Sequence, residues 1–189
     1  MKNIDRNDIN ASSLQIIPVK RDSYIIQFEY SNDKNMEYFK KQIDEKVGSM
    51  SHKTNVKGEM TDYHTFLKDS TFLNFFEQFF MFELRRYQKL FPLREDTLGE
   101  QIKIDEAWGN KLEKGNKVIP HTHPSQWSSI LYFCDSAPLK TELGTFATSK
   151  GKIITLNGWV GHWVEPVHKE RYSLVWNWNY FLPKGFKKE

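Results

Sequence analysis

Hydrophobic residues recur every three to four positions in two stretches of the first half of the chain. This is the period of an amphipathic helix, so we predict helices over residues 36–47 and from Asp69 or Ser70 to about Leu90. Gly48 supplies a stop signal for the first helix, and the side chain of Asp69 or Ser70 can cap the second. The second helix carries a broad aromatic face, which we expect to pack on a sheet.

Alternation with a period of two residues predicts β-strands through most of the remaining chain. Residues 13–30 are interpreted as two strands, the first interrupted by Pro18, whereas residues 49–64 are polar and predicted to form a long loop. After Pro92, short segments rich in β-branched and aromatic residues follow one another, separated by turn residues. We expect β-turns around residues 136–142. Helices followed by closely spaced strands predict an α+β, mainly β fold, either a β-sandwich or a jelly roll with supporting N-terminal helices.

Length and composition limit the possible class of protein. A chain of 189 residues fits a single domain, in which we expect residues 1–98 to supply strands and supporting helices and residues 99–183 the jelly-roll core. The 39% hydrophobic and 15% aromatic content excludes a disordered chain. The net charge of +3 is small and no long basic run is present, so nothing in the composition supports nucleic-acid binding.

Cysteine content and hydropathy bear on the location of the protein. The single cysteine, Cys134, cannot form an internal disulfide, which suits a reducing cytoplasm. The polar start of the chain does not resemble a signal peptide, and the most apolar stretch is too short and too charged to cross a membrane. We therefore expect a cytoplasmic protein without a membrane anchor. No feature of the sequence indicates the oligomeric state.

The last predicted strand has two faces of different character. One face is large and aromatic and is expected to pack against the helices. The other is smaller and more polar, and it consists of Arg171, Ser173, Val175, Asn177 and Asn179. An arginine inside a barrel needs an anionic partner because an unpaired buried charge is costly. A carboxylate bound by the guanidinium fork would satisfy it.

Two histidines, His121 and His123, stand one residue apart just before an apolar run. Residues i and i+2 of a strand point to the same side, about 6–7 Å apart at their Cα atoms, so the two imidazoles can converge on one metal ion. His162 follows a glycine-bearing turn and opens a later predicted strand. Taken alone, the His-x-His pair fits two structural histidines at a strand edge equally well.

The order of these residues resembles the Fe(II)- and 2-oxoglutarate-dependent oxygenases, in the branch common in bacteria and phages. The resemblance covers roughly residues 101–181. The matching positions are Trp108, Asn110, His121, His123, Pro124, Ser129, Tyr132, His162, Val164, Pro166, Arg171, Ser173 and Asn177.

The resemblance implies a double-stranded β-helix that uses Fe(II), 2-oxoglutarate as co-substrate and O2 to hydroxylate a substrate. It implies that His121 and His162 are iron ligands and that Arg171, with Ser173 and Tyr132, binds the far carboxylate of 2-oxoglutarate. Trp108, Asn110, Ser129 and Asn177 are expected to line the pocket.

The chain departs from most members of that superfamily at His123, where an aspartate or glutamate usually completes the metal triad. We expect His123 to be the third ligand on the basis of its spacing. A carboxylate from elsewhere is an alternative, and Asp135, Glu142 and Glu165 are the candidates in the region. A site with only two protein ligands is the third arrangement.

Two other functions remain open from the sequence. The segment GNKVIPHTH matches the Gly-x5-His-x-His opening of cupins, so the chain could be a three-His metalloenzyme that does not use 2-oxoglutarate. It could also be a non-catalytic jelly-roll binding module. No Ser-His-Asp order, P-loop or dinucleotide fingerprint is present. The substrate, a small molecule or a protein side chain, is not encoded in a motif, and we expect residues 49–64 and 136–142 to select it.

Overall fold

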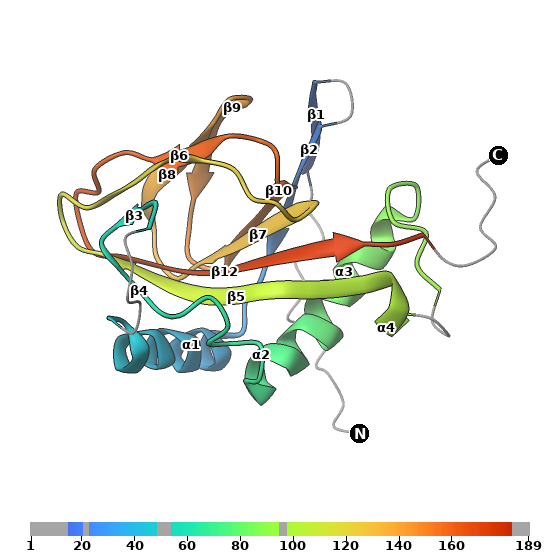
Figure 1. The fold of residues 1–189 in the computed structure, drawn as a ribbon, viewed down its shortest axis with the longest axis horizontal. Coiled ribbons are helices and arrows are strands. Elements are labelled where there is room, and N and C mark those ends of the chain that lie inside the picture. The colour runs from blue at the N-terminus through green and yellow to red at the C-terminus, as the bar shows by residue number, and fades with distance from the viewer. Residues whose placement is uncertain (1–14, 21–22, 49–53, 95–97, 183–189) are drawn as a thin grey trace.

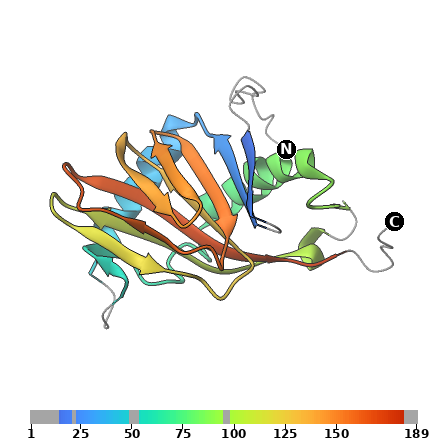
Figure 2. The same cartoon turned by 90° about the horizontal axis from the view of Figure 1, so that it is seen from above.

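The structure, a computed structural model, describes residues 15–20, 23–48, 54–94 and 98–182. Two antiparallel sheets face each other, and helices cover the outer side of the larger sheet (Figures 1 and 2). The strands are β1 (Gln15–Lys20), β2 (Ser23–Glu29), β3 (Val56–Lys57), β4 (Glu59–Met60), β5 (Ile102–Leu112), β6 (Lys117–His121), β7 (Trp127–Tyr132), β8 (Ser136–Thr141), β9 (Gly144–Thr148), β10 (Lys152–Asn157), β11 (His162–Val164) and β12 (Arg171–Tyr180). The helical segments are α1 (Asp33–Lys46), α2 (Ser70–Phe75), the π-helical η3 (Phe76–Phe80), α3 (Met81–Leu84), the 3-10 turn η4 (Arg85–Tyr87) and α4 (Leu98–Gln101).

The strands wind between the two sheets in the manner of a jelly roll. The larger sheet has the order β1-β2-β10-β7-β12-β5-β4, and the smaller has the order β3-β6-β11-β8-β9. From β5 to β12 the chain passes repeatedly from one sheet to the other, which is the winding of a double-stranded β-helix. The prediction of an α+β, mainly β jelly roll is therefore confirmed. Strands from residues 1–98 also join both sheets, because β2 pairs with β10 and β3 with β6.

Both predicted helices form, and local capping explains where each begins. The Asn32 side chain accepts a hydrogen bond from the backbone N–H of Asn35 at 3.0 Å, and α1 follows. The Asp69 side chain accepts one from the backbone N–H of Phe72 at 2.9 Å, at the start of α2. These bonds satisfy amide groups that lack partners in the first turn of a helix. Helical structure then continues from α2 to η4, with the π turn η3 in its middle.

The hydrophobic core has two layers, one on each side of the larger sheet. In the outer layer, the Phe80 ring centroid lies 5.1 Å from that of Trp176 and 5.5 Å from that of Trp178. The inner layer lies between the sheets and contains Val175 of β12 and Ile130 of β7. The aromatic face of the last strand therefore packs on the helices, as its alternation predicted.

Two stretches predicted as loop or turn contain strands instead. Within residues 54–64, Val56 of β3 pairs with Val118, and Met60 of β4 pairs with Asn110; residues 49–53 lie outside the described residues. Residues 136–141 form β8, which pairs with β9 and β11. These predictions were wrong because strands at or near a sheet edge are held by backbone hydrogen bonds, which leave little trace in the side-chain pattern.

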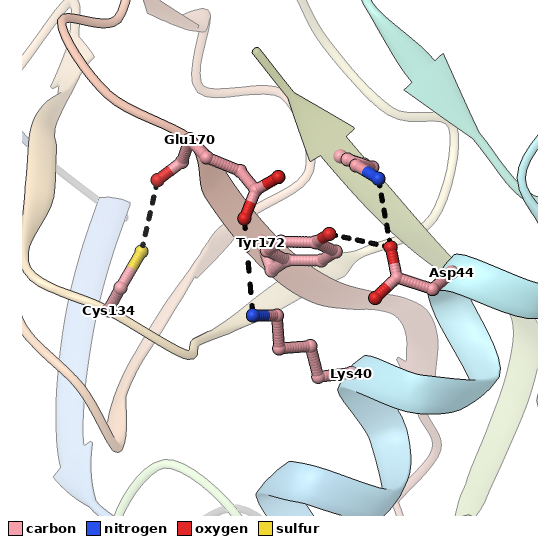
Figure 3. A network of polar contacts seen from close by, with 6 residues as sticks. Lys40, Asp44, Cys134, Glu170 and Tyr172 are labelled. Atoms are coloured by element: carbon pink, nitrogen blue, oxygen red, sulfur yellow. Dashed lines mark hydrogen bonds and ion pairs between the residues drawn. The ribbon is translucent and has the colours of Figure 1, made fainter. Parts of the chain in front are cut away.

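Polar contacts fasten α1 to the start of β12 (Figure 3). Asp44 accepts hydrogen bonds from the Tyr172 hydroxyl at 2.6 Å and from Lys111 Nζ at 2.9 Å. Burial opposes ionisation of Asp44, but these two bonds prevail and lower the pKa of its carboxyl group. Lys40 Nζ also lies 4.0 Å from a Glu170 carboxylate oxygen. Figure 3 marks this ion pair with a dashed line. The helix thus supports the end of β12 at which Arg171 lies.

Within the described residues, no helix combines the length and the apolar character that a membrane crossing requires.

Candidate metal centre

Three histidines meet between the two sheets. His121 ends β6, His162 opens β11 and pairs directly with His121, and His123 follows β6 by two residues. One candidate ligand nitrogen from each ring lies within 4.8 Å of the other two. The ring centroids are 4.4 Å apart for His121 and His162, and 4.9 Å and 5.1 Å from these two rings for His123. This convergence suits a single metal ion.

Backbone carbonyls fix the proton positions of two of these rings. Nδ1 of His121 donates to the carbonyl oxygen of Ile119 at 2.9 Å, and Nδ1 of His162 donates to that of Val160 at 2.9 Å. A carbonyl oxygen can only accept, so in the neutral ring Nε2 carries the free lone pair. A hydrogen bond of this kind to the second nitrogen is typical of metal-binding histidines.

The electrostatic environment keeps all three imidazoles neutral. Burial lowers the pKa of His162 to about 4, and the neighbouring His121 adds to the effect. Burial likewise lowers the pKa of His123 to about 3, with contributions from the other two histidines. Burial also lowers the pKa of His121. Neutral imidazole is the form that binds a metal, and it suits Fe(II) among other transition metals, so the residues fit the group that the sequence predicts.

The carboxylates considered as substitutes for His123 lie elsewhere. Glu165 accepts from Lys140 Nζ at 3.1 Å and from Trp163 Nε1 at 3.1 Å on the surface. Asp135 accepts from the backbone N–H of Lys150 at 3.1 Å, and Glu142 is exposed. Among the described residues, the group with metal-ligand spacing contains only the three histidines.

The side-chain amide of Asn177 connects His123 to Glu106, a half-buried residue of β5. The Asn177 side chain, fully buried on β12, places Nδ2 at 2.7 Å from Glu106 Oε2 and 3.1 Å from His123 Nδ1. A carboxylate only accepts, so the amide nitrogen must face Glu106. From the sequence, Asn177 was expected only to line the pocket. Its amide donates to Nδ1 of His123, so in the neutral ring the proton is on Nε2, and that atom can bind a metal only after the proton has moved.

Arg171 is a buried cation, and no buried anion lies beside it among the described residues. Its side chain is 3% exposed and lies in the cavity that the three histidines line. Its guanidinium carbon lies 5.0 Å from the centroid of the Tyr132 ring, and its Nε atom has no hydrogen-bond partner within the described chain. Burial lowers the pKa of Arg171, yet a guanidinium remains protonated in proteins. A small anion entering the cavity would balance this charge.

Polar residues beside Arg171 complete one end of the cavity. Asn110 donates from Nδ2 to Ser173 Oγ at 3.4 Å and accepts from Trp108 Nε1 at 3.0 Å. Burial raises the pKa of Tyr132 to about 12, against the effect of the nearby Arg171 charge, so its hydroxyl keeps its proton. Trp108, Asn110 and Ser173 therefore line the cavity, and Tyr132 lies next to Arg171.

Ser129 lies outside this cavity, contrary to the sequence prediction. Its hydroxyl is 2.8 Å from Thr155 Oγ1 and accepts from Trp178 Nε1 at 2.9 Å, on the side of β7 that faces the helices. Residues 129 and 132 are separated by an odd number of positions, so one strand cannot point both side chains to the same face. Tyr132 takes the inner face and Ser129 the outer one.

Glu106 is the residue that the sequence prediction missed. It lines a second cavity, of about 170 Å³, which also borders Trp108, His121 and His123. The strand alternation could have indicated this role. Glu106 stands two positions before Trp108 and four before Asn110 on one strand, so the three side chains share a face.

No family model matches this sequence. No curated protein matches it either. The fold, by contrast, matches solved structures. A viral collagen prolyl hydroxylase from Paramecium bursaria Chlorella virus 1, described as its 2OG complex, superposes with a TM-score of 0.62 at 9% identity, over 82% of this chain and 94% of the other. A prolyl-4-hydroxylase from Pseudomonas putida superposes with a TM-score of 0.60 at 14% identity, over 83% and 92% of the two chains. At these identities the likeness establishes the fold.

Proposed function

We propose that this chain, which has the double-stranded β-helix fold of the prolyl hydroxylases, is an Fe(II)- and 2-oxoglutarate-dependent oxygenase that hydroxylates its substrate. The observation that carries the proposal is the combination of three neutral imidazoles and a buried, unpaired arginine in one cavity. Metal ligands alone would fit many enzymes. The arginine adds a binding group for a small anion beside the metal, which an oxygenase of this class requires.

Each residue has a specific role in this proposal. His121 and His162 offer Nε2 to Fe(II), because their Nδ1 protons are held by backbone carbonyls. His123 is proposed as the third ligand. Bound Fe(II) would supply the coupling of O2 reduction to the oxidative decarboxylation of 2-oxoglutarate.

The remaining residues bind and orient the co-substrate. Arg171 would hold the far carboxylate of 2-oxoglutarate through its guanidinium fork, with the hydroxyl groups of Ser173 and Tyr132 as further donors. The buried walls exclude water from the same space. No side chain needs to act as a general acid or base, which agrees with the neutral imidazoles at the centre.

Arg171 also weighs against the alternatives. A cupin-type metalloenzyme that does not use 2-oxoglutarate has no need for a buried cation in the metal cavity. A non-catalytic binding module has no need for three histidines with lowered pKa values at metal-ligand spacing. The substrate is proposed to be a small molecule or a protein side chain, and the single cysteine favours a cytoplasmic location.

The test is an anaerobic titration of the protein with Fe(II) and then with 2-oxoglutarate. We expect one Fe(II) per chain and, on addition of 2-oxoglutarate, the visible metal-to-ligand charge-transfer band of the chelated co-substrate. His162→Ala should bind no Fe(II). A protein that binds iron but gives no band and consumes no 2-oxoglutarate would support a cupin-type metalloenzyme instead. A protein that binds no metal would support a non-catalytic binding module.

A further inference from the structure

The inner faces of β5 and β12 form a trough whose two ends carry opposite charge. Along this trough Ser173 pairs with Asn110, Val175 with Trp108, and Asn177 with Glu106. Arg171 lies at one end and Glu106 at the other, about 20 Å apart by strand rise over six residues. His123 contacts this trough at a point between Arg171 and Glu106. It makes a polar contact with Asn177, and its ring centroid is 5.8 Å from that of Trp108.

In the part of the chain that the structure describes, the negative end of the trough has no counter-ion. Glu106 is half-buried, and one of its oxygens accepts the hydrogen bond from Asn177. That bond comes from a neutral amide and leaves the negative charge in place. Within the described residues Glu106 forms no ion pair, and no lysine or arginine lines its cavity. A glutamine would serve equally well if the residue only had to hold Asn177.

The cavity at this end also has aromatic walls. Tyr63 and Trp108 line it, and their ring centroids are 5.2 Å apart in an edge-to-face arrangement. Aromatic faces attract cations, and a carboxylate beside them adds a direct ionic contact. The volume of about 170 Å³ suits the end of a side chain or a small amine rather than a large ligand. His121 and His123 form the boundary towards the metal centre.

We propose that this cavity is a substrate subsite that binds a positively charged nitrogen group, an ammonium or a guanidinium, with Glu106 as its counter-ion. Bound there, the cation places the carbon atoms next to it beside the histidine cluster. The inference rests on the proposed oxygenase function for its meaning, although the cation site itself does not depend on metal. The cation belongs either to a free amine or to a lysine or arginine side chain of a protein.

The experiment measures how strongly Mn(II), bound in place of Fe(II) with 2-oxoglutarate present, broadens the proton NMR lines of added probes. N-acetyl-lysine amide and N-acetyl-arginine amide represent protein side chains, and 1,5-diaminopentane and agmatine represent free amines. N-acetyl-norleucine amide and 1,5-pentanediol are the uncharged controls. We expect at least one charged probe to be broadened about fivefold more than its control, the ratio that about 1 kcal/mol produces. The pair with the larger ratio identifies the source of the cation.

The Glu106→Gln variant removes the charge but keeps an acceptor for Asn177, so the fold and the metal site should persist. We expect this variant to broaden charged and uncharged probes equally. Glu113→Gln is the matched control, because Glu113 is exposed at the turn after β5, outside this cavity. Equal broadening of charged and uncharged probes by the unaltered protein would overturn the inference, and so would an unchanged preference in Glu106→Gln.

Two further measurements separate this inference from the proposed function. Mn(II) binding is followed by electron paramagnetic resonance, and probe binding to the metal-free protein by saturation-transfer NMR. A protein that binds metal and 2-oxoglutarate without preferring cations would retain the function and lose the subsite. A protein that binds no metal but still prefers cations through Glu106 would retain the subsite and lose the function.

Discussion

Arg171 combines a cost to the fold with a benefit to binding. Its buried charge has no anionic partner among the residues that the structure describes, and such a charge destabilises the folded state until an anion binds. Function and stability therefore place opposite demands on this position. The same reasoning distinguishes a residue retained for a ligand from one retained for the fold.

Replacing Arg171 should separate these two effects. We expect Arg171→Met to weaken 2-oxoglutarate binding about 10- to 150-fold, the range for losing a charged hydrogen bond of about 1.5–3 kcal/mol. It should also raise the free energy of unfolding of the ligand-free protein. Arg171→Lys should restore part of the affinity, because an ammonium group cannot make the bidentate contact. Anaerobic titration and urea unfolding measure the two quantities. Lys114→Met, which removes an exposed cation, should change neither; unaltered 2-oxoglutarate affinity in Arg171→Met would refute the assignment.

Asn177 should act as a positioning residue for His123. The Asn177 amide donates to Nδ1 of His123, which keeps the proton of the neutral ring on Nε2 and opposes coordination through that atom. Asn177→Leu removes this constraint, so we expect the variant to bind Fe(II) or Co(II) more tightly, by about 10-fold. Asn179→Leu is the control, since Asn179 lies two residues further along β12 and contacts Asp105 and Gln126 instead. Metal affinity that is equal in both variants and the parent would indicate a site formed by His121 and His162 alone.

At the scale of elements, a glycine joins the two segments that carry the histidines. Gly158, in the connection from β10 to β11, accepts from the backbone N–H of His123 at 2.8 Å and donates to the carbonyl oxygen of Gln126 at 2.8 Å. A Cβ atom at Gly158 would overlap the backbone carbonyl oxygen of Ser125. The close approach of two backbones thus holds the segment after β6 next to the segment before β11.

Gly158→Ala should therefore separate these segments. We expect a loss of about 1–3 kcal/mol in the free energy of unfolding, the usual cost of overpacking, together with weaker metal binding. Gly161→Ala is the matched control, because its added Cβ would meet the flexible, exposed side chain of Glu142, which can move aside. Urea unfolding and metal titration of both variants measure the difference. Similar behaviour of the two would show that the backbone contact does not hold the site.

At the scale of the whole molecule, enclosing histidines between two sheets links stability to pH. The pKa of His162 is about 4 in the folded protein, whereas an unfolded histidine titrates near 6.5. As pH falls below about 6.5, the unfolded chain binds a proton that the folded protein does not, so the free energy of unfolding decreases. Above about pH 7 both states are neutral and the effect vanishes.

For metal-free protein, we expect His162 alone to reduce the free energy of unfolding by about 2 kcal/mol between pH 7 and pH 5. His123, whose pKa is also lowered, should add to this loss. Urea unfolding in the presence of a chelator measures the slope. His162→Gln removes one titrating group and should flatten the pH dependence. The same slope in that variant would contradict burial of a neutral His162.

The sequence by itself determined the features that follow from local periodicity. It predicted the helices at 36–47 and from Asp69 or Ser70 to about Leu90, the two faces of β12 and a mainly β fold, because side-chain alternation reports directly which face of an element is buried. The choice of a jelly roll over a β-sandwich came from the family resemblance. It also singled out His121 and His123 by their i, i+2 spacing, His162 by its place in the family motif, and Arg171 because a buried charge is costly without a partner.

Only the tertiary structure decided what depends on contacts between distant segments. It turned Ser129 away from the cavity, placed β3, β4 and β8 in stretches predicted as loop or turn, and brought Glu106 to His123 through Asn177. Edge pairing is made by backbone groups that every residue possesses, and an amide bridge between two strands depends on their register. Neither leaves a pattern within a single segment of sequence, so each had to be read from the folded chain.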